Sequence, residues 1–264
     1  FGHYYPRLIA MATPRGATYS AGSGVTIYGG MAAEHGNVRV AIWGQSNAIG
    51  RALRTAIAAA PLSSDAELQD YDAGTFDRVY IWASGAYAKL QPSVNNGADA
   101  GQFGAEFGLA VRWMRETTSG NLYLEKHAGS GLSIDSNTFK RGIWPYTTAV
   151  SNRASAHSWL STNGSTLDRE AWLWVQGESD MSQTQSWYQT RLEQLIADRL
   201  LDGFQDSSAL NMLAQMAAGT AGYGAGVAAA KTAIAAANPS NTVAFAAPGY
   251  MKADNLHQNG RGQV

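Results

Sequence analysis

Short apolar runs alternate with longer amphipathic segments from Val38 onward, and this alternation restricts the possible folds more than any other feature. Five runs have the length and composition of buried strands: 38–43, 78–82, 121–125, 171–175 and 242–246. Between them, residues 103–114 and 187–200 carry apolar side chains at helical spacing. Strands that alternate with helices predict βαβ units, and therefore a parallel sheet covered by helices on both faces.

The length of the chain suits one main domain. Its 264 residues are enough for one sizeable α/β domain. Residues 1–37 lack helical periodicity and contain prolines and several glycines, which indicates a lead-in or linker before a domain over 38–264. Because the chain begins at Phe1 without a signal-peptide pattern, we expect a processed chain or a piece of a longer polypeptide.

The composition argues against several classes of function. Charged residues make up only 15% of the chain, the net charge is -1, and no Lys/Arg cluster indicates a nucleic-acid partner. The chain has no cysteine, so thiolate catalysis and cysteine-based metal sites are excluded. No apolar stretch reaches about 18 residues, so we expect no membrane span. A surface poor in charge is compatible with neutral sugar substrates.

The first candidate site is Gly44-Gln45-Ser46-Asn47, directly after the first predicted strand. A glycine there permits a tight turn, which would place the Ser46 hydroxyl at the carboxyl edge of the sheet, at the start of a helix running towards Ala60. Backbone N–H groups at a helix start can stabilise an oxyanion. Ser46 is therefore a candidate nucleophile. Serine is also a favoured N-cap residue, however, and Ala48 replaces the second glycine of the G-x-S-x-G elbow.

The second candidate site is the pair Asp254 and His257, which follows the last predicted strand. A serine hydroxyl needs a general base, and a histidine serves when a carboxylate fixes its tautomer. The spacing allows Asp254 to reach Nδ1 of His257 while Nε2 faces outward. A surface aspartate beside an ordinary histidine is the alternative, and His127 is a rival base.

A polar turn follows the strand at 171–175. Gln176 could offer its side-chain N–H to an oxyanion. Glu178 and Asp180 could form the carboxylate pair of a glycosidase, but bracing of the loop or capping of the next helix is the simpler interpretation.

A glycine-rich turn at 127–134 follows the strand at 121–125. Its glycines allow close backbone approach to a ligand, and one of their N–H groups could complete an oxyanion hole. Most glycine-rich turns only connect two elements of secondary structure and bind no ligand. However, all four motifs follow predicted strands, in the order nucleophile, glycine loop, polar turn, then Asp and His. Ligands of such sheets bind at the carboxyl ends of the strands.

Together these motifs resemble those of the SGNH hydrolases, most closely their sialate O-acetylesterase and acetylxylan esterase branch. The resemblance rests on four motifs: GQSN at 44–47, the glycine-rich turn at 129–134, WVQGESD at 174–180 and DNLH at 254–257. It spans the chain from about Val38 to the C-terminus. With the strand–helix alternation, it implies an α/β fold, a three-layer α/β/α sandwich that is flavodoxin-like with about five parallel strands.

The resemblance also implies a serine esterase that removes O-acetyl groups from a carbohydrate without a metal or an organic cofactor. Residue by residue, it implies Ser46 as nucleophile, His257 as general base and Asp254 as the partner that orients it. Ser46 would attack the acetyl carbonyl, and water would hydrolyse the acetyl-serine intermediate.

An oxyanion hole is implied from the backbone N–H groups of Ser46 and Gly131, with Gly129 as the alternative loop donor. Ser179 stands where the family has its asparagine, so Gln176 is expected to supply the side-chain donor. Supporting roles are expected for three neighbours: Gln45, Asn47 and Glu178.

The carbohydrate itself stays open. Acetylated xylan, sialic acid or a bacterial surface polysaccharide would each fit. Four aromatic residues expected in loops could stack on sugar rings: Trp82, Tyr87, Trp144 and Tyr146. A glycosidase using Glu178 and Asp180 is one alternative, and a non-catalytic carbohydrate-binding module of a larger surface or phage-tail protein is another. We expect a secreted or extracellular protein of bacterial or phage origin, with a cytoplasmic location as the alternative. The oligomeric state is not indicated.

Overall fold

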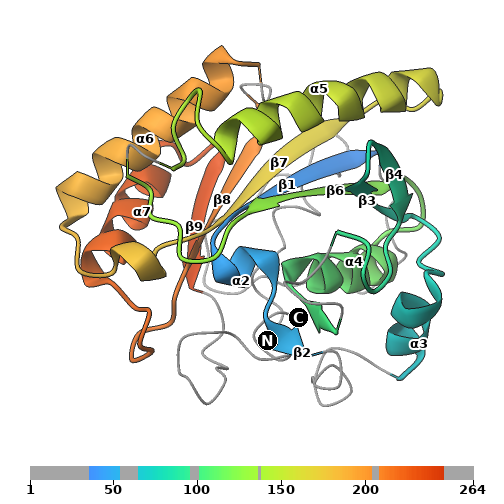
Figure 1. The fold of residues 1–264 in the computed structure, drawn as a ribbon, viewed down its shortest axis with the longest axis horizontal. Coiled ribbons are helices and arrows are strands. Elements are labelled where there is room, and N and C mark those ends of the chain that lie inside the picture. Colours follow the sequence, from blue (N-terminus) through green and yellow to red (C-terminus); the bar gives the residue numbers. More distant parts are fainter. Residues whose placement is uncertain (1–35, 54–64, 96–100, 136–137, 204–207, 247–264) are drawn as a thin grey trace.

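A seven-stranded sheet forms the centre of the molecule (Figure 1). The computed structural model describes residues 36–53, 65–95, 101–135, 138–203 and 208–246. The strands lie in the order β4-β3-β6-β1-β7-β8-β9. Their bounds are β1 (Val38–Gly44), β3 (Val79–Ala83), β4 (Ala86–Lys89), β6 (Leu122–Ala128), β7 (Arg169–Val175), β8 (Leu210–Gln215) and β9 (Thr242–Ala246). All neighbours pair in parallel except β3 and β4, which are antiparallel.

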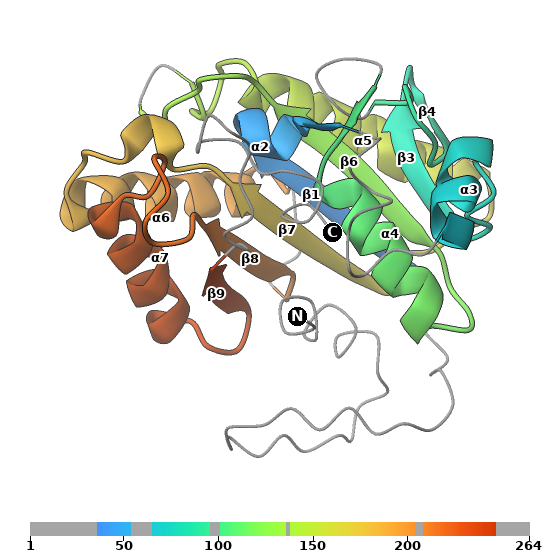
Figure 2. The same ribbon diagram turned by 90° about the horizontal axis from the view of Figure 1, so that it is seen from below.

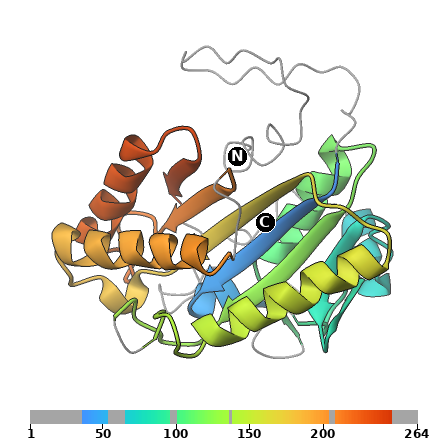
Figure 3. The ribbon, with the colours of Figure 1, turned by 90° about the horizontal axis from the view of Figure 1, so that it is seen from above.

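The helices cover both faces of this sheet, which confirms the predicted three-layer α/β/α sandwich. Among the described residues they are α2 (Ser46–Ile49), α3 (Asp65–Ala73), α4 (Ala105–Glu116), α5 (Tyr146–Thr162), the short 3-10 helix η2 (Glu178–Asp180), α6 (Gln185–Leu201) and α7 (Ala225–Ala237). Figure 2 shows α3 and α4 on one face, and Figure 3 shows α5 and α6 crossing the other. A small antiparallel pair, β2 (Ala52–Leu53) and β5 (Gln102–Phe103), lies outside the main sheet.

Strand β1 shows how the sequence divides the two cores. Val40 and Ile42 pack into the core shared with α3 and α4, whereas Ala41 and Trp43 pack into the core shared with α5, α6 and α7. Successive side chains of a strand point to opposite faces, so a continuous apolar run fills both cores.

The five predicted strands are all present, and the sheet contains two more. Strand β8 was not predicted because Asn211 interrupts its apolar run. In the fold Asn211 is buried, and its side chain donates to Thr242 Oγ1 at 3.3 Å. The helix expected to run from Ser46 towards Ala60 was wrong in extent. Helix α2 ends at Ile49, Gly50 has φ 96°, and β2 follows.

The position of β1 in the sheet identifies the edge where a ligand can bind. The chain runs from β1 to β3 on one side of β1, and after β6 it crosses to β7 on the other side, so the direction in which strands are added reverses at β1. Such a switch point opens a crevice at the carboxyl ends of the strands. Residues 1–35 of the predicted lead-in lie outside the described residues.

Candidate active site

Ser46 follows the carboxyl end of β1 through a turn that requires glycine. Gly44 has φ 146°, and a Cβ atom there would lie 1.9 Å from the carbonyl oxygen of Val175. The N–H of Gln45 donates to that same oxygen at 3.1 Å. Gln45 is the N-cap of α2, so Ser46 is not the cap residue but the first residue of the helix. The predicted strand–turn–helix placement of Ser46 is therefore present.

The glycine-rich turn lies directly beside this turn. The Gly129 N–H donates to the carbonyl oxygen of Gly44 at 3.2 Å. A Cβ atom at Gly129 would lie 2.5 Å from Leu132 and 2.7 Å from the ring of Trp144, so the position is closed. Gly131, in contrast, has φ 70° and open space around its Cα. Of the two glycines, Gly131 is the one whose backbone a ligand can approach.

The polar turn after β7 is tied to the turn after β1. Asn47 is fully buried, and its Nδ2 donates to Glu178 Oε1 at 2.5 Å. The Ser179 N–H donates to Gln45 Oε1 at 3.2 Å. Gln45, Asn47 and Glu178, which the sequence predicts as supports, thus connect the two loops that follow the central strands.

Gln176 and Asp180 brace the glycine-rich turn from below. Gln176 Nε2 donates to Asp180 Oδ2 at 2.5 Å and to the carbonyl oxygen of Leu132 at 3.1 Å. Asp180 also accepts from Ser133 Oγ at 2.5 Å and from the Ile134 N–H at 2.8 Å. These bonds occupy both amide hydrogens of Gln176, which argues against its predicted role as an oxyanion donor. They agree with bracing by Asp180.

Lys231 lies beneath the same turn. It is 1% exposed and donates from Nζ to the carbonyl oxygens of Gln176 and Ala214. Burial lowers the pKa of Lys231 to about 8, although the charges of Glu178 and Asp180 act in the opposite direction. A buried ammonium group therefore joins the carboxyl ends of β7 and β8.

A second lysine fixes the other end of α2. Lys126 Nζ donates to the Ile49 carbonyl oxygen at 2.5 Å and to Glu106 Oε2 at 2.9 Å. Glu106 is fully buried and also accepts from the Gly104 N–H at 2.7 Å. Sequence reasoning missed this clamp, although Lys126 and Glu106 stand at the end of a predicted strand and at the start of a predicted helix.

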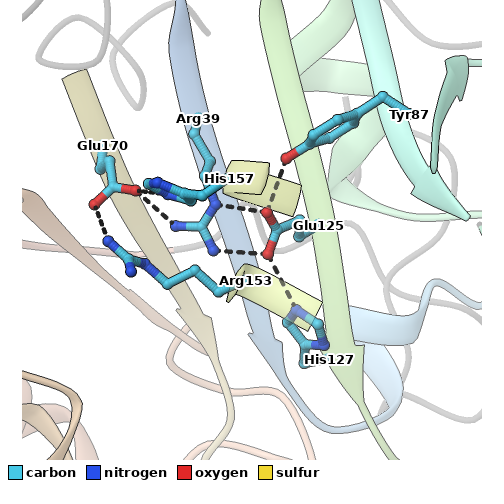
Figure 4. A network of polar contacts seen from close by, with 7 residues as sticks. All are labelled: Arg39, Tyr87, Glu125, His127, Arg153, His157 and Glu170. Atoms are coloured by element: carbon cyan, nitrogen blue, oxygen red, sulfur yellow. Dashed lines mark hydrogen bonds and ion pairs between the residues drawn. The ribbon is translucent and has the colours of Figure 1, made fainter. Parts of the chain in front are cut away.

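Figure 4 shows a buried polar network on the α5 side of the sheet, opposite the side on which Lys126 contacts Glu106 of α4. Arg39 donates from Nε and Nη2 to the two oxygens of Glu125, both at 2.6 Å, and from Nη1 to Glu170 Oε1 at 3.2 Å. The Tyr87 hydroxyl donates to Glu125 at 2.8 Å. His127 Nε2 lies 3.4 Å from the same carboxylate. The rival base His127 thus belongs to this network.

Helix α5 completes the network. His157 Nε2 lies 2.8 Å from Glu170 Oε1, and Arg153 Nη2 donates to Oε2 at 3.3 Å. Burial alone would raise the pKa of Glu170, but the His157 hydrogen bond and the nearby Arg39 and Arg153 charges lower it to about 2. The network joins β1, β6, β7 and α5 in the interior of the sheet, from near the amino ends of β1 and β7 at Arg39 and Glu170 to His127 near the end of β6.

A cavity of about 620 Å³ opens at this edge, beside β6. Its walls come from the end of β3, from residues 93–95, from the end of β6 and from residues 144–152. Of the four aromatic residues expected in loops, Tyr87 and Tyr146 are buried in β4 and α5, and Trp82 is 4% exposed in β3. Only Trp144, which is 54% exposed, presents its ring to solvent.

Asp254 and His257 lie outside the described residues, so their predicted roles stay predictions. Within the described ranges, no group of three or more His, Asp or Glu side chains could hold a metal ion. No helix of this part of the chain is long and apolar enough to cross a membrane.

The sheet, the switch point and the turn at Ser46 define a class of protein: α/β sandwiches with a site at the carboxyl edge of the central strand. Residues 39–264 match the family model described as carbohydrate esterase, sialic acid-specific acetylesterase, and the chain belongs to this family. Its members are carbohydrate acetylesterases, which makes an acetylated carbohydrate the expected substrate class.

Solved structures with the same fold support the architecture. An Arabidopsis thaliana protein superposes with a TM-score of 0.61 at 18% identity, covering 86% of this chain and 93% of the other. NanS superposes with a TM-score of 0.51 at 14% identity, covering 84% and 82%. At these identities the likeness concerns the fold alone. No curated protein sequence gives a significant match.

Proposed function

We propose that the chain is a serine O-acetylesterase of the SGNH type, in which Ser46 attacks the acetyl carbonyl of an acetylated carbohydrate. The observation that carries this proposal is the placement of Ser46 on the turn after the central strand, at the switch point of the sheet. His257 takes the proton of the Ser46 hydroxyl, and Asp254 orients the His257 ring. An acetyl-Ser46 ester forms as the sugar alcohol leaves with that proton, and water, deprotonated by His257, then releases acetate.

The oxyanion hole of this mechanism uses the backbone N–H groups of Ser46 and Gly131. The Gly129 N–H already donates to Gly44, so the accessible Gly131 is the better loop donor. Backbone donors fixed in a closed turn suit a charge that develops only in the transition state. The Asn47–Glu178 bond holds the Ser46 turn against the loop after β7, and Gln176 and Asp180 of that same loop hold the glycine-rich turn that carries Gly131.

A glycosidase built on Glu178 and Asp180 has less support. Asp180 accepts hydrogen bonds from Ser133, Ile134 and Gln176, and Glu178 accepts one from Asn47. General acid and base groups must instead be available to the substrate and to water.

Acetate release from p-nitrophenyl acetate and from acetylated xylan tests the proposal. Ser46→Ala is expected to lose about 10⁴-fold or more in kcat on both substrates while its unfolding transition stays unchanged. His257→Ala should lose a comparable factor, and the double variant little more, because the two residues act as a unit. Acetate release that survives in Ser46→Ala would reject Ser46 as the nucleophile. A wild-type protein that releases none would favour the non-catalytic module.

A further inference from the structure

The cavity beside β6 lies next to the proposed nucleophile. Ala128 lines it and pairs in register with Gly44, two residues before Ser46. Neighbouring strands lie about 4.8 Å apart, so the cavity begins one strand spacing from the Ser46 turn. The ring of Trp144 also lies against Gly129, which links the cavity wall to the glycine-rich turn.

The chemistry of the cavity wall suits an uncharged ligand with hydroxyl groups. Trp144 offers an exposed aromatic face, and the same cavity is lined by hydrogen-bonding groups that carry no charge: Ser84, Asn95, Thr148 and Asn152. Among the described residues of the wall, Lys126 and His127 are the only basic side chains, and no carboxylate is present. Both basic groups already contact carboxylates, Lys126 that of Glu106 and His127 that of Glu125. An acidic ligand would therefore find no uncommitted cation in this part of the wall.

The backbone of the cavity wall is held in an uncommon conformation. Ser84, Ser93 and Asn95 have φ values of 52°, 68° and 47°, and they are the non-glycine residues with positive φ in the described ranges. All of them line this cavity. Such conformations cost free energy and persist only where the surrounding structure enforces them, and they gather at ligand-binding sites. The two-residue turn between β3 and β4 accounts for Ser84, whereas Ser93 and Asn95 lie outside a hairpin turn and indicate a wall shaped for a ligand.

We propose that this cavity is the sugar-binding subsite, and that it takes an uncharged pyranose unit of the acetylated carbohydrate. The apolar face of the ring stacks on Trp144, and its hydroxyls bond to Asn152 and Ser84. The volume of about 620 Å³ lies within the range of about 300–1,000 Å³ that small-molecule sites span. The inference rests on the proposed function for the reaction of the bound sugar. It favours neutral sugars over sialic acid as the unit held here.

Turnover by Trp144→Ala separates this subsite from the catalytic machinery. On acetylated xylo-oligosaccharides, KM should rise roughly tenfold with little change in kcat, because stacking is lost. On p-nitrophenyl acetate, which has no sugar, kcat/KM should stay within about twofold of wild type. Trp144→Phe should recover most of the affinity. Trp159→Ala is the matched control. It removes a tryptophan near the far end of α5, about 20 Å from the start of that helix, and it should leave KM unchanged.

Binding without turnover keeps the inference testable if the esterase proposal fails. In Ser46→Ala, calorimetry should show xylo-oligosaccharide binding that Trp144→Ala abolishes, and weaker binding of O-acetylated sialic acid. An unchanged KM in Trp144→Ala, with p-nitrophenyl acetate still hydrolysed, would overturn the subsite and leave the esterase intact. Absent oligosaccharide binding, or a preference for sialic acid, would overturn the neutral-sugar assignment. A wild-type protein that binds the oligosaccharide but releases no acetate would reject the esterase and keep the subsite.

Discussion

Replacing Arg39 by methionine should destabilise the protein strongly, because Arg39 neutralises two buried carboxylates. Arg39 and Glu125 are both 0% exposed, and Glu170 is 8% exposed. Removing one partner of a buried ion pair costs about 3–5 kcal/mol, out of a typical total of about 5–15 kcal/mol. For a domain of this size, the expected fall in Tm is about 6–20 °C. Urea unfolding followed by circular dichroism measures the free energy of unfolding directly.

The pH dependence identifies the cause of this loss. Burial raises the pKa of Glu125, and the Arg39 charge and hydrogen bonds lower it below its ordinary value. In the wild type, the stabilisation from Glu125 is therefore present above its unfolded pKa and is lost as the pH falls. Without Arg39, burial should place the folded pKa above the unfolded one, so the variant regains stability on acidification. The difference in free energy of unfolding between the wild type and Arg39→Met should therefore decrease as the pH is lowered from about 7 to about 5.

A double variant gives the control. Arg39→Met combined with Glu125→Gln removes the unpaired charge and should recover part of the lost free energy at neutral pH. Two results would contradict this account of the network: a loss of less than about 1 kcal/mol in the free energy of unfolding of Arg39→Met, or a loss that does not change with pH.

Gly44→Ala should abolish acetate release and lower Tm, because its Cβ would lie 1.9 Å from the Val175 oxygen; a fully active, stable variant would show that the Ser46 turn tolerates a side chain. Lys231→Met should remove a rise in stability between about pH 8 and pH 10.5 of up to roughly 1.4 kcal/mol per pH unit. Stability rises with pH in this range because the pKa of Lys231 is lower in the folded state, so the unfolded state binds more protons between the two pKa values. Urea unfolding at several pH values measures this rise. The same slope of unfolding free energy against pH in wild type and Lys231→Met would contradict the prediction. Glu106→Gln should lower kcat on p-nitrophenyl acetate by about tenfold with KM unchanged, because Lys126 loses its partner beneath α2; an equal change in KM would contradict a positioning role.

The pattern of apolar residues predicted most strands of the sheet, but it did not predict strand β8 or the end of helix α2. The apolar runs identified five strands because two-sided burial leaves a continuous apolar signal. Strand β8 carries Asn211, whose bond to Thr242 forms only once β9 lies beside it. The helix after Ser46 stops at Gly50, where any added Cβ atom would lie 2.4 Å from the Phe103 backbone because the two segments pack closely. That contact joins segments far apart in sequence, and no local pattern reports it.

The same distinction applies to the site. The strand–glycine–serine order predicted the placement of Ser46, because the turn is set by residues next to it. Gln176 was expected to face a substrate oxygen, but Tyr188 and Asp180 bind its amide from another helix and from the turn. Whether a polar side chain at a strand end faces inward or outward depends on such partners, which the sequence does not identify.

The charges of this chain are unevenly distributed, and the basic side chains that line the described wall of the cavity are already paired with carboxylates. Only 15% of its residues are charged, yet several of these side chains are buried within the sheet and beneath its carboxyl edge. Arg39 with its carboxylates fixes β1, β6 and β7, Lys126 with Glu106 fixes the end of α2, and Lys231 fixes the ends of β7 and β8. Each of these charges is paired or hydrogen-bonded within the protein, and apart from Lys126 and His127 the described cavity wall presents hydroxyl, amide, aromatic and small apolar groups. A site built in this way would position an ester without attracting charged sugars, which agrees with the neutral subsite proposed above.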